Sequence, residues 1–206
     1  MAAPPQDWLV ALRHSKPLYG ALVCKTPLQG YAIPAAEAWT PTHAMAAARD
    51  AFGHDPVAVF DLTSGGGFYN RGARPWGTAR YHVIPCLLAG RSAGRDDPPT
   101  EDAWHAFWLA MQAADGGGCI VHCRHGFNRS GWMLCRYAVV AGLAPNAHAA
   151  VAAFAEARPP GIYKVGCLYL TQSKTGQASC FPGGWQALPQ TPSQERCARS
   201  GGIRYE

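Results

Sequence analysis

The sequence predicts an α/β domain in which a central, mostly parallel sheet is flanked by helices. Residues 57–62 are apolar except for Asp61, and such a run is typical of a strand buried on both faces of a parallel sheet. A second strand-like run, 119–122, is followed by a short loop and then by a helix-like run, 131–141. This strand–loop–helix order is the unit from which parallel α/β sheets are built.

The length and composition favour one domain with a short extension at each end. The chain has 206 residues and is 48% hydrophobic, which is enough for one core. Residues 1–18 are expected to form an irregular arm that packs on the domain through Trp8 and Leu9. Residues 19–170 are expected to form the domain itself. Residues 171–206 are rich in Gly, Pro, Ser and Gln, so most of them are expected to form a flexible tail.

The first half of the domain is expected to contain strands and a capped helix. Residues 19–24 are a short strand candidate, and residues 80–86 are another. Between them a helix is predicted over residues 41–52, because Thr40 suits the N-cap and a proline follows at the first helical position. Gly53 is expected to end this helix.

The second half is expected to contain three helices. Thr100 suits an N-cap, and the two acidic residues after it complement the helix dipole. The apolar residues of this helix fall at helical spacing and are expected in the core; they are Ala103, Trp104, Phe107, Trp108 and Met111. The helix over 131–141 is expected to end at Gly142, and a further helix is predicted over 145–158.

The loop after the 119–122 strand carries the residues that indicate chemistry. Its backbone N–H groups are expected to point into one hollow, and the following helix dipole adds positive potential there, so the hollow suits phosphate. The same field stabilises a thiolate, which makes Cys123 the candidate nucleophile. The other residues expected to line the phosphate are His122, Arg124, His125, Gly126, Phe127, Asn128 and Gly131.

Two further residues of the loop complete the predicted chemistry. Arg129 offers a planar fork that can hold two phosphate oxygens, and Ser130 can help the sulfur leave. The expected reaction is attack of sulfur on phosphorus, a phosphocysteine intermediate and hydrolysis. The alternative is a buried structural cysteine beside a chance arginine, because Cys-x5-Arg alone is a weak pattern. His122, Gly126 and the flanking strand and helix favour the phosphate loop.

The stretch His-Cys-Arg-His-Gly-Phe-Asn-Arg-Ser-Gly resembles the loop of metal-independent RNA 5′-triphosphatases. This branch of the cysteine phosphatase superfamily includes the triphosphatase domain of animal mRNA-capping enzymes, its baculoviral relative and the standalone RNA-ribonucleoprotein-interacting phosphatase. The His-Gly-x-Asn-Arg core separates the branch from ordinary dual-specificity protein phosphatases. Arg124 and Ser130 stand where Thr is commoner; Ser130 keeps the hydroxyl, and Arg124 adds charge.

The resemblance extends over residues 7–170 and implies a dual-specificity phosphatase-like fold. Lys-Thr-Pro-Leu at 25–28, and Asp-Leu-Thr followed after a spacer by Phe68 and Tyr69, match the branch. Ala-Arg-Pro-Pro-Gly-Ile-Tyr-Lys at 157–164 matches capping-enzyme triphosphatase domains. In that stretch, Arg158 and Lys164 are candidate contacts to RNA phosphates, and the alternative is a plain turn with solvated charges.

Three aspartates are candidates for acid–base or supporting roles. Asp61 would lie at the carboxyl end of its strand, where α/β sheets place their sites, so it is either catalytic or a cap for the next loop. Protein phosphatases need a general acid because they expel a poor leaving group. Asp96 or Asp97 could supply it, or both could be solvated loop charges. A triphosphate end expels a diphosphate and needs less help.

The leading hypothesis is an RNA 5′-triphosphatase that removes the γ-phosphate, with removal of the β-phosphate left open. Its partners would be RNA 5′ triphosphate or diphosphate ends, and separate capping or transcription proteins. The alternatives are a dual-specificity protein phosphatase and a phosphate-end binding module without turnover. No cofactor or metal is expected, because the chain has five Glu and no Glu-x-Glu pair.

Charge and cysteine usage bear on the setting. The net charge is +5 and Arg outnumbers Lys 14 to 4, which suits phosphate-rich ligands or reflects a GC-rich genome. The eight cysteines are scattered without a Cys-x-x-Cys pair, so a reducing, intracellular setting is expected, in the nucleus or at the site of transcription. The chain lacks a signal-peptide pattern and a run of about 18 apolar residues, so no membrane span is predicted.

Overall fold

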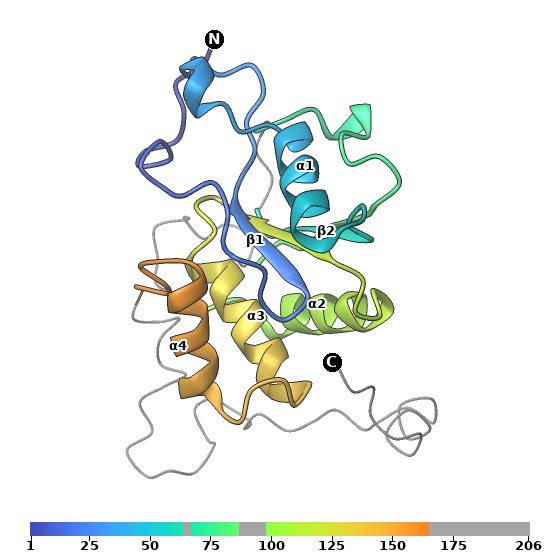
Figure 1. Cartoon of the computed structure of the whole chain (residues 1–206). Helices are drawn as coiled ribbons and strands as arrows, with labels where there is room; N and C mark the ends of the chain where they lie inside the picture. The colour runs from blue at the N-terminus through green and yellow to red at the C-terminus, as the bar shows by residue number, and fades with distance from the viewer. Residues whose placement is uncertain (64–66, 87–97, 165–206) are drawn as a thin grey trace.

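The computed structural model describes residues 1–63, 67–86 and 98–164 (Figure 1). In these residues four parallel strands form a sheet in the order β1-β4-β2-β3. The strands are β1 (Ala21–Lys25), β2 (Ala58–Asp61), β3 (Arg80–Val83) and β4 (Cys119–Cys123). The predicted α/β class with a central parallel sheet is therefore confirmed.

Helices cover both faces of this sheet. The α-helices are α1 (Pro41–Phe52), α2 (Glu101–Ala113), α3 (Asn128–Val140) and α4 (Ala147–Ala157), and two short 3-10 turns are η1 (Ala35–Glu37) and η2 (Arg71–Ala73). Figure 1 shows α1 on one side of the sheet and α2, α3 and α4 on the other. Along β4, Cys119 and Val121 belong to the core under α2, α3 and α4, whereas Ile120 belongs to the core under α1.

The predicted helix starts depend on local capping, and two of them are confirmed. The Thr40 side chain accepts a hydrogen bond from the backbone N–H of His43 and starts α1, and Gly53 ends it in the left-handed region at φ 77°. The Thr100 side chain accepts from the N–H of Ala103 and starts α2. All five apolar residues predicted for α2 are buried.

Other element boundaries differ from the predictions. β1 begins at Ala21 rather than at residue 19, because Tyr19 and Gly20 have φ angles of 51° and 75° that no strand can hold. β3 stops at Val83 rather than at residue 86. α4 begins after Asn146, whose side chain caps it, and not at residue 145. α3 begins at Asn128, three residues before the predicted start, so the end of the loop forms its first turn.

The N-terminal arm packs against the end of β1. The Trp8 side chain is fully buried, and its Nε1–H donates to the carbonyl oxygen of Thr26 at 2.8 Å. The Lys25 ammonium, also buried, donates to the carbonyl oxygens of Trp8 and Ala11, each at 3.0 Å. The prediction for Leu9 as a second anchor is wrong: its side chain is 42% exposed, because only Trp8 inserts into the core.

Some predictions fall on residues outside the described ranges. These are the flexible tail over 171–206 and the candidate acids Asp96 and Asp97. Within the described ranges, no helix has the length and apolar character needed to cross a membrane.

Candidate active site

The candidate nucleophile lies in the middle of the sheet. Cys123 is the last residue of β4, which runs between β1 and β2, and its side chain is 4% exposed. Arg129 and Ser130 occupy the first turn of α3, which follows the loop directly. The structure thus brings together the three residues that the sequence predicted to act on phosphate.

The surroundings of Cys123 stabilise its thiolate. Burial raises the pKa of the Cys123 thiol, but the Arg129 charge, the Ser130 hydroxyl and the backbone N–H groups of Ser130 and Gly126 outweigh this effect. The net result is a pKa below the ordinary value for a thiol. By contrast, burial raises the pKa of the Cys24 and Cys119 thiols to about 12.

The loop holds its carbonyl oxygens away from the sulfur. The carbonyl of Arg124 accepts from the Thr26 N–H at 3.1 Å, and the carbonyls of His125 and Gly126 accept from the Arg158 guanidinium at 2.8 and 2.6 Å. In a trans peptide the next N–H points opposite to the carbonyl. These contacts therefore turn the N–H groups of residues 125–127 toward the inner side of the loop, where an anion would sit.

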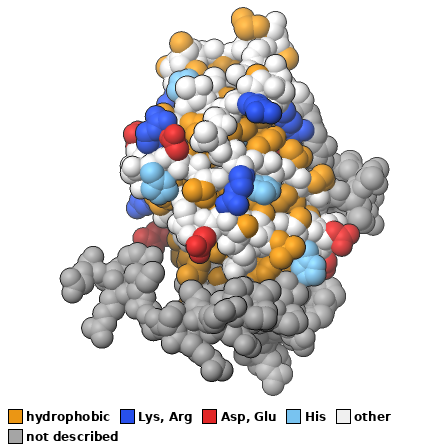
Figure 2. All heavy atoms as spheres, turned by 90° about the vertical axis from the view of Figure 1, so that its right-hand side faces the viewer, with side chains coloured by type: hydrophobic (Ala, Val, Ile, Leu, Met, Phe, Trp, Pro, Cys, Tyr) orange, Lys and Arg blue, Asp and Glu red, His pale blue; other side chains and the backbone are white. Residues whose placement is uncertain are grey.

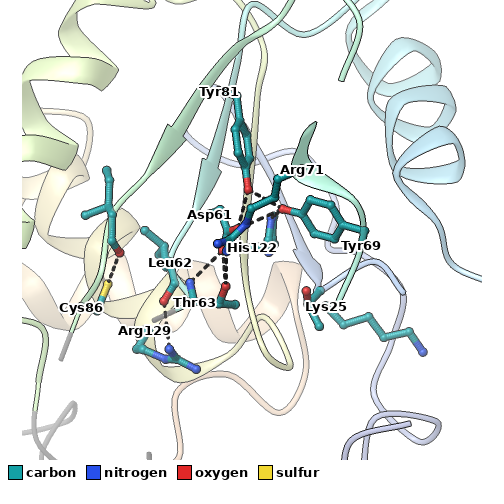
Figure 3. Close-up of polar contacts among 12 residues, drawn as sticks. Lys25, Asp61, Leu62, Thr63, Tyr69, Arg71, Tyr81, Cys86, His122 and Arg129 are labelled. Carbon is teal, nitrogen blue, oxygen red and sulfur yellow. Dashed lines mark hydrogen bonds and ion pairs between the residues drawn. The ribbon is translucent and has the colours of Figure 1, made fainter. Parts of the chain in front are cut away.

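A second polar cluster lies behind the loop and is centred on Asp61 at the end of β2 (Figure 3). Its Oδ1 accepts from the Thr63 N–H at 2.9 Å and from the Thr63 hydroxyl at 2.5 Å. Its Oδ2 accepts from the Tyr81 hydroxyl at 2.6 Å, the Tyr69 hydroxyl at 3.0 Å and Arg71 Nη2 at 2.5 Å. Both carboxylate oxygens of this fully buried side chain are thus occupied.

Two residues connect the Asp61 cluster to the loop: His122, which lies opposite Asp61 in the sheet, and Leu62, which follows it in the chain. His122, which precedes the nucleophile, is fully buried, and its Nε2 lies 3.0 Å from the Tyr69 hydroxyl. Burial lowers the pKa of His122 to about 4, so the ring is neutral near pH 7. Arg129 Nη1 donates to the carbonyl oxygen of Leu62 at 2.9 Å, so the side chain that is predicted to clamp phosphate is held by the residue after Asp61.

Comparison with known proteins agrees with this geometry. No family model matches the chain. The chain is 61% identical over 112 residues to an mRNA-capping enzyme of Danio rerio, and 34% identical over 110 residues to an mRNA-capping enzyme of Mus musculus. Each alignment covers 52% of this chain and only 17% of the length of the relative.

Solved structures show the same fold. Human DUSP28 matches with a TM-score of 0.51 at 16% identity, over 81% of this chain and 92% of that one. PTPMT1 matches with a TM-score of 0.51 at 16% identity, over 71% of this chain and 83% of that one. About half of this chain is thus similar to mRNA-capping enzymes, and its fold is that of DUSP28 and PTPMT1. The predicted dual-specificity phosphatase-like fold is therefore confirmed.

The prediction that Arg158 contacts RNA is wrong. Its side chain is fully buried, and besides the two loop carbonyls it donates to the carbonyl oxygen of Leu12 at 2.8 Å. It also lies over the Phe127 ring, with 4.7 Å from Cζ to the ring centroid. Arg158 therefore joins the arm, the loop and the end of α4 from inside the protein. Lys164 is partly exposed, and its RNA contact stays a prediction.

The residues predicted to line the phosphate have different structural roles. His125 Nε2 lies 2.8 Å from the Gln6 carbonyl oxygen, and Asn128 Oδ1 accepts from the N–H groups of Tyr163 and Lys164 at 3.0 and 2.9 Å. Phe127 is buried and Arg124 is exposed. The side chains of His122, His125 and Asn128 therefore hold neighbouring segments. Contact with phosphate is expected from the backbone N–H groups of the loop instead.

Gly131 and Asp61 are likewise structural neighbours of the site. A Cβ on Gly131 would lie 2.6 Å from Ile162 Cγ1 and 2.7 Å from Phe154 Cε1, so this glycine lets α3 approach α4. For Asp61 the structure favours the supporting role over the direct catalytic one. Its carboxylate is enclosed by donors, and its pKa is held well below its usual range. Asp61 is therefore ionised near pH 7 and carries no proton that it could donate to a leaving group.

Sequence reasoning missed the donors that surround Asp61. In the sequence, the family resemblance is the only feature that singles out Tyr69, and Tyr81 is simply one residue of a predicted strand. Arg71 belongs to η2, an irregular stretch with no periodicity from which its direction could be read. Within the described residues, no group of three or more His, Cys, Asp or Glu side chains is placed to hold a metal ion.

We expect Gly126→Ala to damage the loop. Gly126 has φ 73°, and a Cβ there would lie 2.4 Å from the carbonyl oxygen of Cys24 in β1. We expect a loss of about 3 kcal/mol in unfolding free energy and about 100-fold in activity. Thermal unfolding and kinetics would measure both.

The matched control for this change is Gly142→Ala. Gly142 also has φ 73°, but nothing lies within 4 Å of the Cβ position. It should lose only the conformational part, about 1 kcal/mol, and keep its activity. Equal effects at both glycines would show that the close approach to β1 is unimportant.

We expect Asp61→Asn to cost about 2–3 kcal/mol at neutral pH, because Arg71 and the two tyrosines lose a charged acceptor. Burial alone would raise the pKa of Asp61. The opposing effects of His122 and of the hydrogen bonds from Thr63 and Tyr81 are larger, so the folded pKa lies well below the unfolded value. Its contribution is therefore present above the unfolded pKa of about 3.9 and is lost as pH falls toward the folded pKa.

The measurement is thermal unfolding of both proteins from about pH 7 to pH 3. The gap between wild type and Asp61→Asn should be largest at neutral pH and should narrow in acid. A gap that stays constant over this range would contradict the stabilising role of the ionised carboxylate.

Proposed function

We propose that this domain removes the γ-phosphate from RNA 5′-triphosphate ends through a phosphocysteine intermediate. The observation that carries the choice of substrate is the 61% identity over 112 residues to a protein named mRNA-capping enzyme. The loop supports the chemistry, because a thiol with a lowered pKa is followed directly by Arg129 and Ser130 in the first turn of α3.

In the first step the Cys123 sulfur attacks the γ-phosphorus, and the bond from that phosphorus to the bridging oxygen breaks. RNA with a 5′-diphosphate end leaves, and the phosphoryl group stays on sulfur. Arg129 holds two of the transferred oxygens and the charge on them through Nε and Nη2, the two guanidinium nitrogens that do not donate to Leu62. Diphosphate is a good leaving group, so this step needs little help from a general acid.

In the second step water attacks the phosphocysteine and releases inorganic phosphate. The sulfur leaves as a thiolate, so the groups that lower the pKa of Cys123 also stabilise this product. Ser130 is fully buried, and its hydroxyl lowers the pKa of the Cys123 thiol, so we assign it this role in the departure of sulfur. The positive charge comes from Arg129 and the N–H groups, which predicts a reaction that does not need a metal.

The test is phosphate release from triphosphate-ended RNA and from a phosphotyrosine peptide, side by side with EDTA present. We expect strong preference for the RNA and an undiminished rate in EDTA. Strong preference for the peptide would instead establish the dual-specificity protein phosphatase alternative, and Asp96 and Asp97 would be the next residues to substitute. Analysis of the RNA product shows whether it ends in diphosphate or monophosphate.

The proposed activity also fixes a setting. Triphosphate ends arise where RNA is synthesised, so we propose action at the site of transcription, beside separate capping or transcription proteins. A thiolate nucleophile requires a reducing compartment.

A further inference from the structure

A basic pocket opens beside the candidate active site, outside the loop that carries Cys123. It has a volume of about 550 Å³ and is lined by Arg71 and residues 74–81. This is the size range of small-ligand and nucleotide sites. None of the residues assigned above to the chemistry lines it.

The pocket starts at the Asp61 cluster and leads away from it along the sheet edge. Arg71, at one end, donates to Asp61 Oδ2 and to the Thr63 hydroxyl, on either side of the Leu62 carbonyl that holds Arg129. Arg80, at the other end, pairs with Ala58 at the start of β2, whereas Asp61 ends that strand. Three strand residues span about 10 Å, so the pocket is elongated.

The charge of the pocket is positive and uncompensated. The positive charge of Arg71 is compensated by its ion pair with Asp61. Arg80 Nη2 donates to a backbone carbonyl, that of Ala113, at 2.6 Å, and so keeps its net charge. Arg74 is exposed, and its side chain makes no hydrogen bond or ion pair within the part of the chain that the structure describes. Among the described residues, no Asp or Glu lines the pocket.

Figure 2 views the side of the molecule on which the green segment before β3 lies in Figure 1. Basic and acidic side chains on this side are both spread among apolar ones. The aromatic side chains of the pocket are already engaged: Trp76 is 2% exposed, and its ring stacks on Tyr81 at 6.2 Å between centroids. Contacts in the pocket would therefore be made mainly with charged groups of a ligand rather than by stacking.

We propose that this pocket binds the phosphodiester backbone of the single-stranded RNA that follows the triphosphate end. The inference rests on the proposed function, because it takes RNA as the substrate. A positive groove that tracks the backbone, without reading bases, is the way proteins hold single strands independently of sequence. Arg74 and Arg80 would contact successive phosphates while the triphosphate lies in the loop.

The test uses an RNA that cannot be a substrate. A labelled single strand of about ten nucleotides with a 5′-hydroxyl end is titrated with the full chain, and its fluorescence anisotropy is followed between about 50 and 200 mM salt. Wild type should bind with a strong salt dependence. Arg74→Gln should raise Kd about tenfold and reduce the salt slope by about 1.

The variants separate a local contact from general charge. Arg74 has φ 48°, and Gln is no more strained there than Arg, so Arg74→Gln should fold as wild type does; Arg80→Gln is the second variant. Arg49→Gln is the control, because Arg49 lies on the surface in the last turn of α1, paired with Asp55. It removes the same charge and should leave Kd unchanged.

The outcomes decide the matter. No measurable binding by wild type, or equal losses of binding in Arg74→Gln and Arg49→Gln, would overturn the pocket assignment. Binding of the 5′-hydroxyl RNA that depends on Arg74, together with no phosphate release from triphosphate RNA, would retain the pocket and reject the proposed function. The two failures are therefore distinguishable.

Discussion

Cys123→Ser should abolish turnover and leave the fold intact. A hydroxyl remains protonated in surroundings that lower the pKa of a thiol, so the variant lacks the anionic nucleophile that Arg129 and the loop N–H groups stabilise. We expect phosphate release to fall by about 10⁵-fold, the scale seen when a covalent nucleophile is removed. Binding of triphosphate RNA should persist, because the hollow and its charges remain.

The matched control is Cys135→Ser. Cys135 is also fully buried, lies on α3, and has a thiol pKa that burial raises well above the ordinary value. This change should leave the rate near wild type.

A thiol-directed alkylating reagent at neutral pH should label Cys123 before Cys24 or Cys119, because only the Cys123 thiol has a lowered pKa among these three. Wild-type turnover by Cys123→Ser would reject the covalent mechanism.

The elements that could be predicted from the sequence are those whose structure depends on residues close together in the chain. The helix over Pro41–Phe52 has its cap, its first-position proline and its terminal glycine within the segment itself, so its boundaries could be predicted. The loop from Cys123 to Ser130 was predictable for the same reason, since strand, turn glycine and helix follow one another directly. In both cases the local pattern contains the physical cause.

What the sequence could not predict depends on contacts between distant segments. Arg158 looked like a surface charge beside a turn, but the Leu12 carbonyl, 146 residues away in the chain, helps to hold it inside the protein. The carbonyls of His125 and Gly126 complete its environment. Burying an arginine is favourable only when such acceptors converge on it, and no local pattern shows that they will.

The same holds for the support behind the nucleophile. Asp61 was placed correctly at the end of a strand, but whether it caps a loop or acts on substrate depended on Tyr69, Arg71 and Tyr81. These three residues come from segments whose relative positions only the folded sheet defines. Their convergence on one carboxylate favours a supporting role for Asp61 over transfer of a proton to substrate.

Arg129 is expected to serve both as a clamp for phosphate and as a charge that stabilises the thiolate, and two substitutions separate these roles. Arg129→Lys keeps the charge near Cys123 but loses the planar fork, and an ammonium cannot hold two oxygens in that geometry. We expect kcat to fall by about 10²–10³-fold, while the acidic limb of the pH profile stays where it is in wild type.

Arg129→Gln removes the charge as well. Because Arg129 lowers the pKa of the Cys123 thiol, its loss should raise that pKa. The thiolate then forms only at higher pH, so the acidic limb should move upward in addition to the fall in kcat. An acidic limb at the same pH in both variants would mean that the backbone N–H groups and Ser130 stabilise the thiolate without Arg129. A wild-type rate in Arg129→Lys would mean that a single positive charge suffices and that the fork is not the clamp.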